Sequence, residues 1–252
     1  MEPKISKDTL DKLRKVRVVD VSDALDSLGI LDSRTMDPGI KALWQPVKVV
    51  GIAKTIKLLP RILPVQPVEY ESFEDYLMKT QVGYVFEKKS DQGVNEWDQL
   101  LDDHLRHGAK EELEGSVLVY DAGGLPISFW GSEISLRAKE KGVVGTVIDG
   151  GCRDIHEIKL EEYPVFNRLV VPGMGGNRLS LGGVDIEIQC GGVMVRPGDI
   201  IIGDEHGVIA IPPQMAEEVA DRALRVLDQD IKWRRMYYKK LGIKPDYTIE
   251  AE

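Results

Sequence analysis

The stretch WGSEISLRAKEKGVVGTVIDGGCRDIHE, residues 130–157, decides the fold of this chain. Its first part predicts a helix that begins at Gly131 and ends at Gly142, because aliphatic positions recur at helical spacing and glycine favours the left-handed conformation that follows a helix. Residues 143–148 are apolar and β-branched, which predicts a short strand buried on both faces. Together these two elements predict part of an open α/β sheet.

A turn at residues 149–151 follows this strand and brings Arg153 and Asp154 to its carboxyl end, where open α/β sheets place their ligands. A guanidinium beside a carboxylate can hold a planar oxyanion while the carboxylate orients a hydrated divalent metal. The helix start at Gly131 offers free backbone N–H groups to a substrate carboxylate. Together these features predict a site for a 2-oxo acid, and the alternative is a surface ion pair after a tight turn.

The composition excludes several classes of protein. The chain of 252 residues is long enough for one large domain or two small ones with a substantial core. Its net charge of −9 argues against a nucleic-acid surface, because phosphate binding needs clustered lysines and arginines. Cys152 and Cys190 have no metal-ligand spacing and no disulfide framework, which favours a reducing compartment. Without an apolar leader or a run of about 20 apolar residues, we expect a cytoplasmic protein and no membrane partner.

Before the central stretch, the sequence predicts helices at residues 7–14 and 22–29 and strands at residues 47–58 and 115–121. Ser22 is a suitable N-cap for the second helix, and Gly29 ends it. Gly51 lies inside the long strand, where it indicates a bulge. Asp121 ends the last strand and either faces the site or caps the turn that follows.

Residues 60–112 differ in character from the rest, since they begin with a proline-rich run and then mix acids with aromatic residues. They are either an insertion or an irregular lid. Residues 96–105 have helical periodicity with an acidic face. His104 and His107 are candidate metal ligands beside these acids, but we favour a solvated helix face, as charge runs usually form one.

After the central stretch, short strands are expected at residues 163–171, 184–190, 193–195, 200–203 and 208–211. Their even spacing predicts a compact β unit. The glycines between residues 172 and 183 have the wrong spacing for a dinucleotide loop, and no helix follows them, so we reject a Rossmann fold. Asp204 and Glu205 are candidate metal ligands, but an ordinary hairpin turn is the favoured interpretation.

A last helix is expected from Pro213 to Gly242 and is longer than one side of a small domain can cover. Trp233 and nearby tyrosines predict that its end packs against a partner chain, because aromatic residues are enriched at interfaces. Asp230 and Arg234 lie four residues apart, which is also the spacing of a simple helical ion pair.

Several pieces of the chain resemble the RraA-like family, which includes the 4-hydroxy-4-methyl-2-oxoglutarate/4-carboxy-4-hydroxy-2-oxoadipate aldolases and the regulators of ribonuclease E activity. The pieces cover roughly two-thirds of the chain, and the central one is specific. They are VSDALDSLG (21–29), PGIKALWQPVKVVGIAKTIK (38–57), EGSVLVYDAGG (114–124), WGSEISLRAKEKGVVGTVIDGGCRDIHEI (130–158), YPVF (163–166) and GGVMVRPGDIIIGDEHGVIAIPPQMAEEV (191–219).

The resemblance implies an α/β fold of the swivelling β/β/α type. We expect a single compact domain over residues 1–227, with an unmatched insertion at about residues 60–113, and a C-terminal helical arm over residues 228–252 that packs on a neighbouring subunit. The family assembles as trimers or as dimers of trimers, with sites between subunits. The implied partners are thus a small 2-oxo acid and further copies of this chain.

The resemblance also implies roles for individual residues. Arg153 would bind the pyruvate moiety and stabilise its enolate, and Asp154 would hold Mg²⁺ or Mn²⁺ largely through water. An acid from the C-terminal helix of the neighbouring subunit completes the metal shell in some relatives, and Asp230 is the candidate here. Ser132 departs from the glycine that aldolase members often carry at that step. The substrate carboxylate would bind the backbone of four residues, Gly131, Ser132, Glu133 and Ile134.

The leading functional hypothesis is a class II, metal-dependent aldolase or lyase that cleaves a 4-hydroxy-2-oxo dicarboxylic or tricarboxylic acid through a pyruvate enolate, with oxaloacetate decarboxylation as a second activity. No lysine of the central stretch is placed to form a Schiff base, which favours the metal route. The base that takes the substrate hydroxyl proton is not visible in the sequence, and a metal-bound water is one candidate. The alternatives are a non-catalytic regulatory binding protein and a related lyase with a different small acid.

Overall fold

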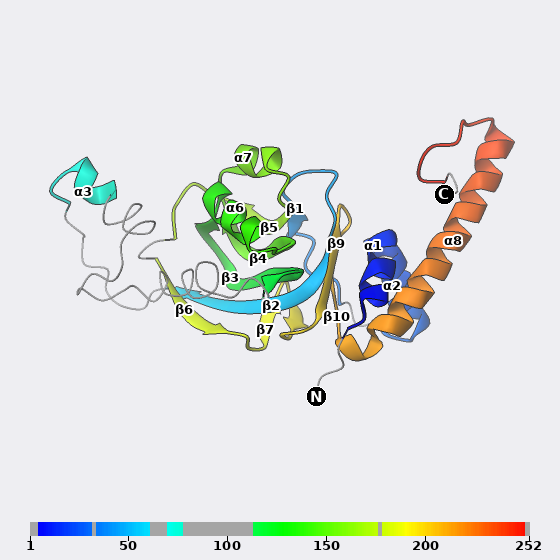
Figure 1. The fold of residues 1–252 in the computed structure, drawn as a ribbon, viewed down its shortest axis with the longest axis horizontal. Helices are drawn as coiled ribbons and strands as arrows, with labels where there is room; N and C mark the ends of the chain where they lie inside the picture. The colour runs from blue at the N-terminus through cyan, green and yellow to red at the C-terminus, as the bar shows by residue number, and fades with distance from the viewer. Residues whose placement is uncertain (1–4, 32–33, 61–69, 78–112, 176–177, 250–252) are drawn as a thin grey trace.

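The computed structural model describes residues 5–31, 34–60, 70–77, 113–175 and 178–249, and its centre is a mixed sheet (Figure 1). The strand order is β1-β5-β4-β3-β2-β9-β10, and β6 pairs with the second half of β2. The strands are β1 (Lys41–Ala42), β2 (Val49–Pro60), β3 (Ser116–Trp130), β4 (Gly145–Cys152), β5 (Val165–Val170), β6 (Leu179–Val184), β9 (Ile200–Asp204) and β10 (Gly207–Ile211). A separate hairpin consists of β7 (Ile188–Cys190) and β8 (Val193–Val195).

The middle of the sheet is parallel and carries the central stretch of sequence. β2, β3, β4 and β5 run in the same direction, and the outer strands pair with them antiparallel. Every residue of β4 is buried, which confirms the prediction of a strand covered on both faces. The carboxyl ends of β3 and β4 therefore meet at one edge of the sheet, next to the helices that follow them.

Helices α6 (Ser132–Glu140) and α7 (Ile155–Leu160) lie on one side of this parallel sheet, and the β7–β8 hairpin lies on the other (Figure 1). Ala138 of α6 and Ile158 of α7 are fully buried in the first hydrophobic cluster, against side chains of β3 and β4. Ile188 and Val195 of the hairpin belong to a second cluster on the opposite face. The sheet is thus covered on both sides, as apolar parallel strands require.

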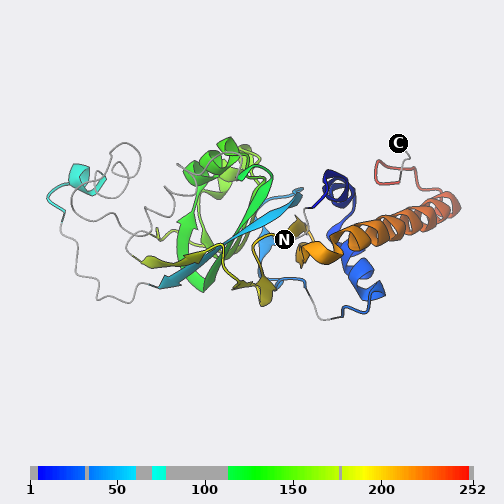
Figure 2. The same cartoon turned by 60° about the horizontal axis from the view of Figure 1, so that its bottom comes forward.

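A third cluster joins β9 and β10 to the helices α1 (Lys7–Lys15), α2 (Val18–Ser27) and α8 (Ala216–Leu241). A short 3-10 turn, η3 (Pro213–Met215), precedes α8, and Gly242 with a φ of 68° ends it, which confirms the expected long helix. Figure 2 shows that the second half of α8 projects beyond the body of the molecule. The protein is a single domain with a C-terminal helix.

Two expectations about these elements were wrong. The second helix begins at Val18, and Ser22 lies inside it. Its N-cap is Arg17, whose backbone N–H donates to Asp20, and the N–H of Val18 donates to Asp204, a residue distant in sequence. Gly51 makes no bulge, and the register of β2 shifts at residues 57–58 instead. Gly51 is required for space, since a Cβ there would lie 2.6 Å from the carbonyl oxygen of Gly115.

The two strands that lead to the predicted site are also longer than expected. β4 continues through its glycine pair to Cys152. β3 continues past the turn at residues 122–124 to Trp130, with register shifts relative to β4 where the extra residues are accommodated. The glycines of β4 permit this close approach, because a Cβ at Gly151 would lie 2.5 Å from the carbonyl oxygen of Ile127.

Much of the segment 60–112 lies outside the described residues, including the expected helix at residues 96–105 and the candidate ligands His104 and His107. The described part of this segment contains the short helix α3 (Phe73–Leu77). Among the helices of the described ranges, none is both long and apolar enough to cross a bilayer.

Candidate active site

The turn after β4 sets the orientation of Arg153 and Asp154. The backbone N–H of Arg153 donates to the carbonyl of Trp130 at 3.0 Å, which fixes the turn against the end of β3. Asp154 then takes a left-handed conformation with a φ of 56° and becomes the N-cap of α7. Both side chains remain about 40% exposed, and Arg153 Nε lies 3.8 Å from Asp154 Oδ1. The pair is therefore loose and accessible to a ligand.

The start of α6 faces this turn. Gly131 is the N-cap of α6, and the backbone N–H of Ser132 donates to Asp154 Oδ2 at 3.2 Å. A Cβ at Gly131 would collide with the same carboxylate oxygen. The carboxylate of Asp154 thus lies at the N-terminus of α6, where the helix dipole and unpaired N–H groups favour an anion. The structure brings together the two halves of the site that the sequence predicts.

The other two residues of the expected carboxylate cradle lie in the first turn of α6. Glu133 is exposed and forms an ion pair along the helix with Arg137, and Ile134 packs on the first hydrophobic cluster. Their N–H groups belong to the first turn of α6, whose donors have no partner within the helix. Trp130 anchors this turn, because its buried indole donates to Ser135 Oγ at 2.9 Å.

Glu161 also contacts this site, and the sequence analysis did not identify it. Ser132 Oγ donates to Glu161 Oε1, while Glu161 Oε2 is buried and has no hydrogen-bond partner among the described residues. The position follows Asp154 by seven residues, at the opposite end of α7. That spacing is the sequence signal that could have found it.

Cys152 is not a nucleophile in this site. The thiol is fully buried, and burial together with the nearby charge of Asp154 raises its pKa to about 12. The side chain therefore stays a neutral thiol near pH 7 and packs as a small apolar group.

Asp121 does not face the site and instead caps its turn. Its carboxylate accepts hydrogen bonds from the backbone N–H groups of Gly123 at 3.0 Å and Gln189 at 3.2 Å. It also pairs with Lys57 at 2.6 Å. The turn-capping interpretation is confirmed, and Asp121 joins β3 to β2 and to the β7–β8 hairpin.

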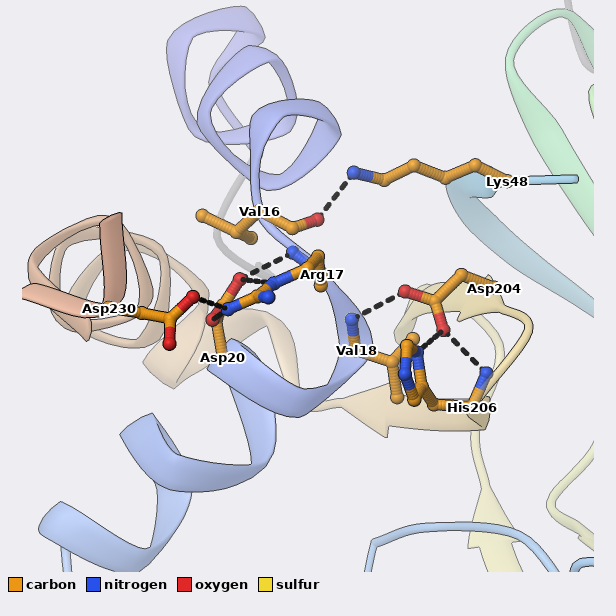
Figure 3. Close-up of polar contacts among 8 residues, drawn as sticks. All are labelled: Val16, Arg17, Val18, Asp20, Lys48, Asp204, His206 and Asp230. Atoms are coloured by element: carbon orange, nitrogen blue, oxygen red, sulfur yellow. Dashed lines mark hydrogen bonds and ion pairs between the residues drawn. The ribbon is translucent and has the colours of Figure 1, made fainter. Parts of the chain in front are cut away.

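The Asp204, Glu205 and His206 side chains form a cluster whose potential ligand atoms lie within 4.8 Å of one another. Figure 3 shows that both carboxylate oxygens of Asp204 already have partners. Oδ2 accepts from the backbone N–H of Val18 at 2.8 Å, and Oδ1 accepts from the backbone N–H of His206 at 2.8 Å. The hairpin turn that we favoured between β9 and β10 is confirmed.

Asp230 lies on α8, where it pairs with Arg17 at 3.0 Å, and Arg17 also binds Asp20 at 2.7 Å (Figure 3). Arg234 donates instead to Tyr238 and Thr248, so the alternative of a helical ion pair between residues 230 and 234 is wrong. Within one chain Asp230 belongs to the cluster of α2 and α8 rather than to the Arg153 turn. Its role as a metal ligand from a neighbouring subunit stays a prediction.

The fold and the site together define an α/β protein in which parallel strands bring a guanidinium and a carboxylate to the start of a neighbouring helix. The family model described as RraA-like (Aldolase/RraA) matches residues 18–210, and the chain belongs to this family. The fold class predicted from the resemblance is confirmed.

Two relatives show the range of similarity in sequence. An uncharacterized protein of Methanocaldococcus jannaschii is 40% identical over 132 residues, which are 52% of this chain and 63% of that protein. A protein of Thermus thermophilus named 4-hydroxy-4-methyl-2-oxoglutarate aldolase is 33% identical over 110 residues, which are 43% of this chain and 66% of that protein. The matches thus span less than two thirds of either relative.

Solved structures match over most of the chain. An uncharacterized protein from Pseudomonas syringae superposes with a TM-score of 0.67 at 28% identity, covering 95% of this chain and 96% of its own. RraAS2 of Streptomyces coelicolor, described as an unusual member of the RNase ES inhibitor RraA family, has a TM-score of 0.67 at 23% identity, covering 93% of this chain and 100% of its own. The second likeness concerns the fold alone.

Proposed function

We propose that this protein is a divalent-metal-dependent carbon–carbon lyase that cleaves a 4-hydroxy-2-oxo dicarboxylic or tricarboxylic acid to pyruvate and a second oxo acid. The observation that carries the proposal is the meeting of Arg153, Asp154 and the N-terminus of α6 at one edge of the sheet. Membership of a family that contains aldolases supports the same chemistry.

The donor set fits a hard divalent cation such as Mg²⁺ or Mn²⁺. Mg²⁺ binds one or two carboxylates and keeps several waters, so one accessible carboxylate with space for solvent suffices. Asp154 meets this description, since it is about 40% exposed and only loosely paired with Arg153. When bound, such an ion supplies a Lewis acid for the 2-oxo group. Asp230 of a neighbouring subunit is the proposed further ligand.

The chain's own groups bind the substrate and stabilise charge. The free N–H groups of the first turn of α6 hold the carboxylate next to the 2-oxo group. The Arg153 guanidinium faces the oxygen that becomes negative as the enolate forms, which lowers the barrier when the donor is already oriented. Oxaloacetate decarboxylation passes through the same enolate, so we expect it as a second activity.

The test is pyruvate release from oxaloacetate and from 4-carboxy-4-hydroxy-2-oxoadipate, with Mg²⁺ and with EDTA, after subtraction of the metal-only background. Arg153→Ala and Asp154→Asn should each lower kcat/KM by about 100-fold or more, as losses of charge-stabilising groups do. Asparagine tolerates the left-handed backbone at this position, so the second variant keeps the turn. Exposed Arg196 supplies the control Arg196→Ala.

Variants that stay folded and release pyruvate as fast as the wild type would refute the proposed site. If the folded wild-type oligomer releases no pyruvate from either compound, the proposed substrates are wrong. The remaining candidates are then a related lyase with another small acid and a regulatory binding protein.

A further inference from the structure

Ser132 is held between two carboxylates that flank the same short helix. Its backbone N–H donates to Asp154, immediately before α7, and its hydroxyl donates to Glu161, immediately after α7. Ser132 and Glu161 are both partly buried, and the Oε2 atom of Glu161 is fully buried. Glu161 therefore reaches the site through the hydroxyl of Ser132.

The surroundings of Glu161 hold it in place but leave one oxygen unused. Lys139 Nζ donates to the backbone carbonyl of Glu161 at 2.7 Å, which fixes the end of α7 against α6. Within the described part of the chain, the buried Oε2 atom has no hydrogen-bond partner. Buried polar atoms are normally paired, so each exception needs an explanation. A carboxylate that must accept a proton during a reaction supplies one.

We propose that Ser132 and Glu161 form a proton relay that takes up the proton of the substrate hydroxyl during carbon–carbon cleavage. This inference rests on the proposed function, for which it supplies the base that the sequence does not reveal. In this relay Ser132 is the catalytic residue, since its hydroxyl contacts the substrate hydroxyl. Glu161 is a positioning residue and proton store that acts through the serine hydroxyl.

The step balances without a further reagent. The substrate hydroxyl gives its proton to Ser132 Oγ, and Ser132 gives its own proton to Glu161. The C3–C4 bond of the substrate breaks, its former hydroxyl oxygen becomes a carbonyl, and the electron pair of that bond becomes the pyruvate enolate. The enolate then takes a proton from water at C3, which yields pyruvate, and Glu161 releases its proton to solvent through Ser132.

Other groups near the turn are less suited to this role. His156 and Glu157 lie in the first turn of α7 and are exposed, and their side chains make no hydrogen bond or ion pair within the described residues. In the described ranges, no contact orients either side chain toward the start of α6. Ser132 is thus the hydroxyl that two independent contacts fix at this position.

Comparing two reactions that form the same enolate distinguishes a proton relay from a purely structural role of Glu161. Cleavage of 4-carboxy-4-hydroxy-2-oxoadipate needs a base for the hydroxyl proton, whereas decarboxylation of oxaloacetate does not. Positioned acid–base groups typically contribute about 10²- to 10⁴-fold. Glu161→Gln keeps an acceptor for Ser132 but cannot take a proton, so we expect it to lower kcat of the cleavage by about 100-fold or more. Decarboxylation should fall by less than about three-fold.

Three further variants complete the experiment. Ser132→Ala should show the same selective loss, and Glu161→Asp should recover part of the cleavage rate. Glu162→Gln changes the adjacent exposed carboxylate and is the matched control, with both reactions unchanged. Binding of oxalate, an analogue of the pyruvate enolate, measured by calorimetry should be equal in the wild type and in Glu161→Gln.

An equal loss of both reactions in Glu161→Gln, or weaker oxalate binding, would show that Glu161 only supports the fold of the site and would overturn the relay. Wild-type cleavage rates in both Glu161→Gln and Ser132→Ala would overturn it as well. If the wild type catalyses neither reaction, the proposed function fails, and the relay fails with it.

Discussion

Gly131 is the residue at which the site tolerates least change. It is the N-cap of α6, and the space beside its Cα is filled by the carboxylate of Asp154. Its backbone is extended, with a φ of −160°, so any residue could adopt the conformation. The requirement for glycine at this position is therefore a requirement for space.

We expect Gly131→Ala to displace the Asp154 carboxylate and to lower pyruvate release by about 10-fold or more, since misplacement by about 1 Å can cost that much. Stability should change by no more than about 1 kcal/mol, because alanine is a poor but tolerated N-cap. Gly173→Ala is the control, since nothing lies within 4 Å of a Cβ there. Equal activities in the two variants would contradict the close packing of Gly131 against Asp154.

The buried thiol of Cys152 predicts a loss of stability at alkaline pH. Its pKa is about 12 in the folded protein, compared with an ordinary value of 9.0 for a thiol exposed in the unfolded chain. Above pH 9.0 the unfolded chain releases the thiol proton while the folded chain keeps it, so stability falls as the pH rises. The contribution of the buried thiol to the free energy of unfolding is complete below pH 9.0 and decreases by about 1.4 kcal/mol per pH unit above it.

Chemical denaturation of the wild type and Cys152→Ala at several pH values measures this contribution. The stability advantage of the wild type should shrink by about 2 kcal/mol between pH 7.5 and pH 10.5. Between pH 6.0 and pH 7.5 the difference should stay constant, which is the internal control. A constant difference over the whole range would mean that the thiol titrates normally.

At the scale of elements, the β9–β10 hairpin supports the start of α2. Asp204 is buried and accepts the first backbone N–H of α2, donated by Val18 (Figure 3). Removing a buried acceptor leaves its donors unpaired, which costs about 1–3 kcal/mol. We therefore expect Asp204→Ala to lower the free energy of unfolding by that amount, measured in urea.

The neighbouring exposed Glu205 supplies the matched control, since Glu205→Ala should change stability by less than about 0.5 kcal/mol. Added Mg²⁺ should stabilise neither variant more than the wild type, because both oxygens of Asp204 are already engaged. A stability of Asp204→Ala within the range of the control would show that the hairpin does not cap the helix.

The same contact shows why the sequence predicted some elements better than others. The central helix and strand were found because their signals are local, in apolar spacing and in the glycine after α6. The start of α2 was misplaced because its N-cap is Arg17, which is not a typical capping residue, and because Asp204, which accepts the N–H of Val18, lies 186 positions away. The role of Gly51 was missed because the obstructing carbonyl belongs to Gly115 on a neighbouring segment.

The sequence also predicted some parts of the candidate site and missed others. The order of strand and helix predicted that Arg153 and Asp154 reach the sheet edge near Gly131, because connections between parallel strands are regular. Glu161 was not found, since its importance depends on one hydrogen bond to Ser132 and on the burial of its second oxygen. Such facts follow from packing and leave only the seven-residue spacing in the sequence.

At the scale of the whole molecule, the second half of α8 has the character of an interface. Trp233, Met236, Tyr237 and Leu241 are each more than half exposed and recur at helical spacing. Residues 231–245 contain six lysines and arginines and no acid, whereas the whole chain carries a charge of −9. A basic, aromatic helix on an acidic protein fits the surface of a second copy of the same chain.

We predict that this arm holds a homo-oligomer together, a trimer or a hexamer. The double variant Trp233→Ser and Tyr237→Ser should dissociate by at least one oligomeric step in sedimentation velocity, because buried aromatic anchors dominate interface energies. Met194→Ser removes an apolar side chain that is 49% exposed on β8 and serves as the control. A wild-type protein that sediments as a monomer would refute the prediction.

The length of the short helix α7 is constrained by the residues at its two ends. Asp154 and Glu161 lie at the two ends of the six residues of α7, and both accept hydrogen bonds from Ser132. The length of α7 therefore sets the distance between the two carboxylates. Each added or deleted residue would shift one end by about 1.5 Å and turn it by about 100°. The length of this segment is therefore fixed more strictly than its composition, and exposed side chains such as Lys159 can vary while the residue count cannot.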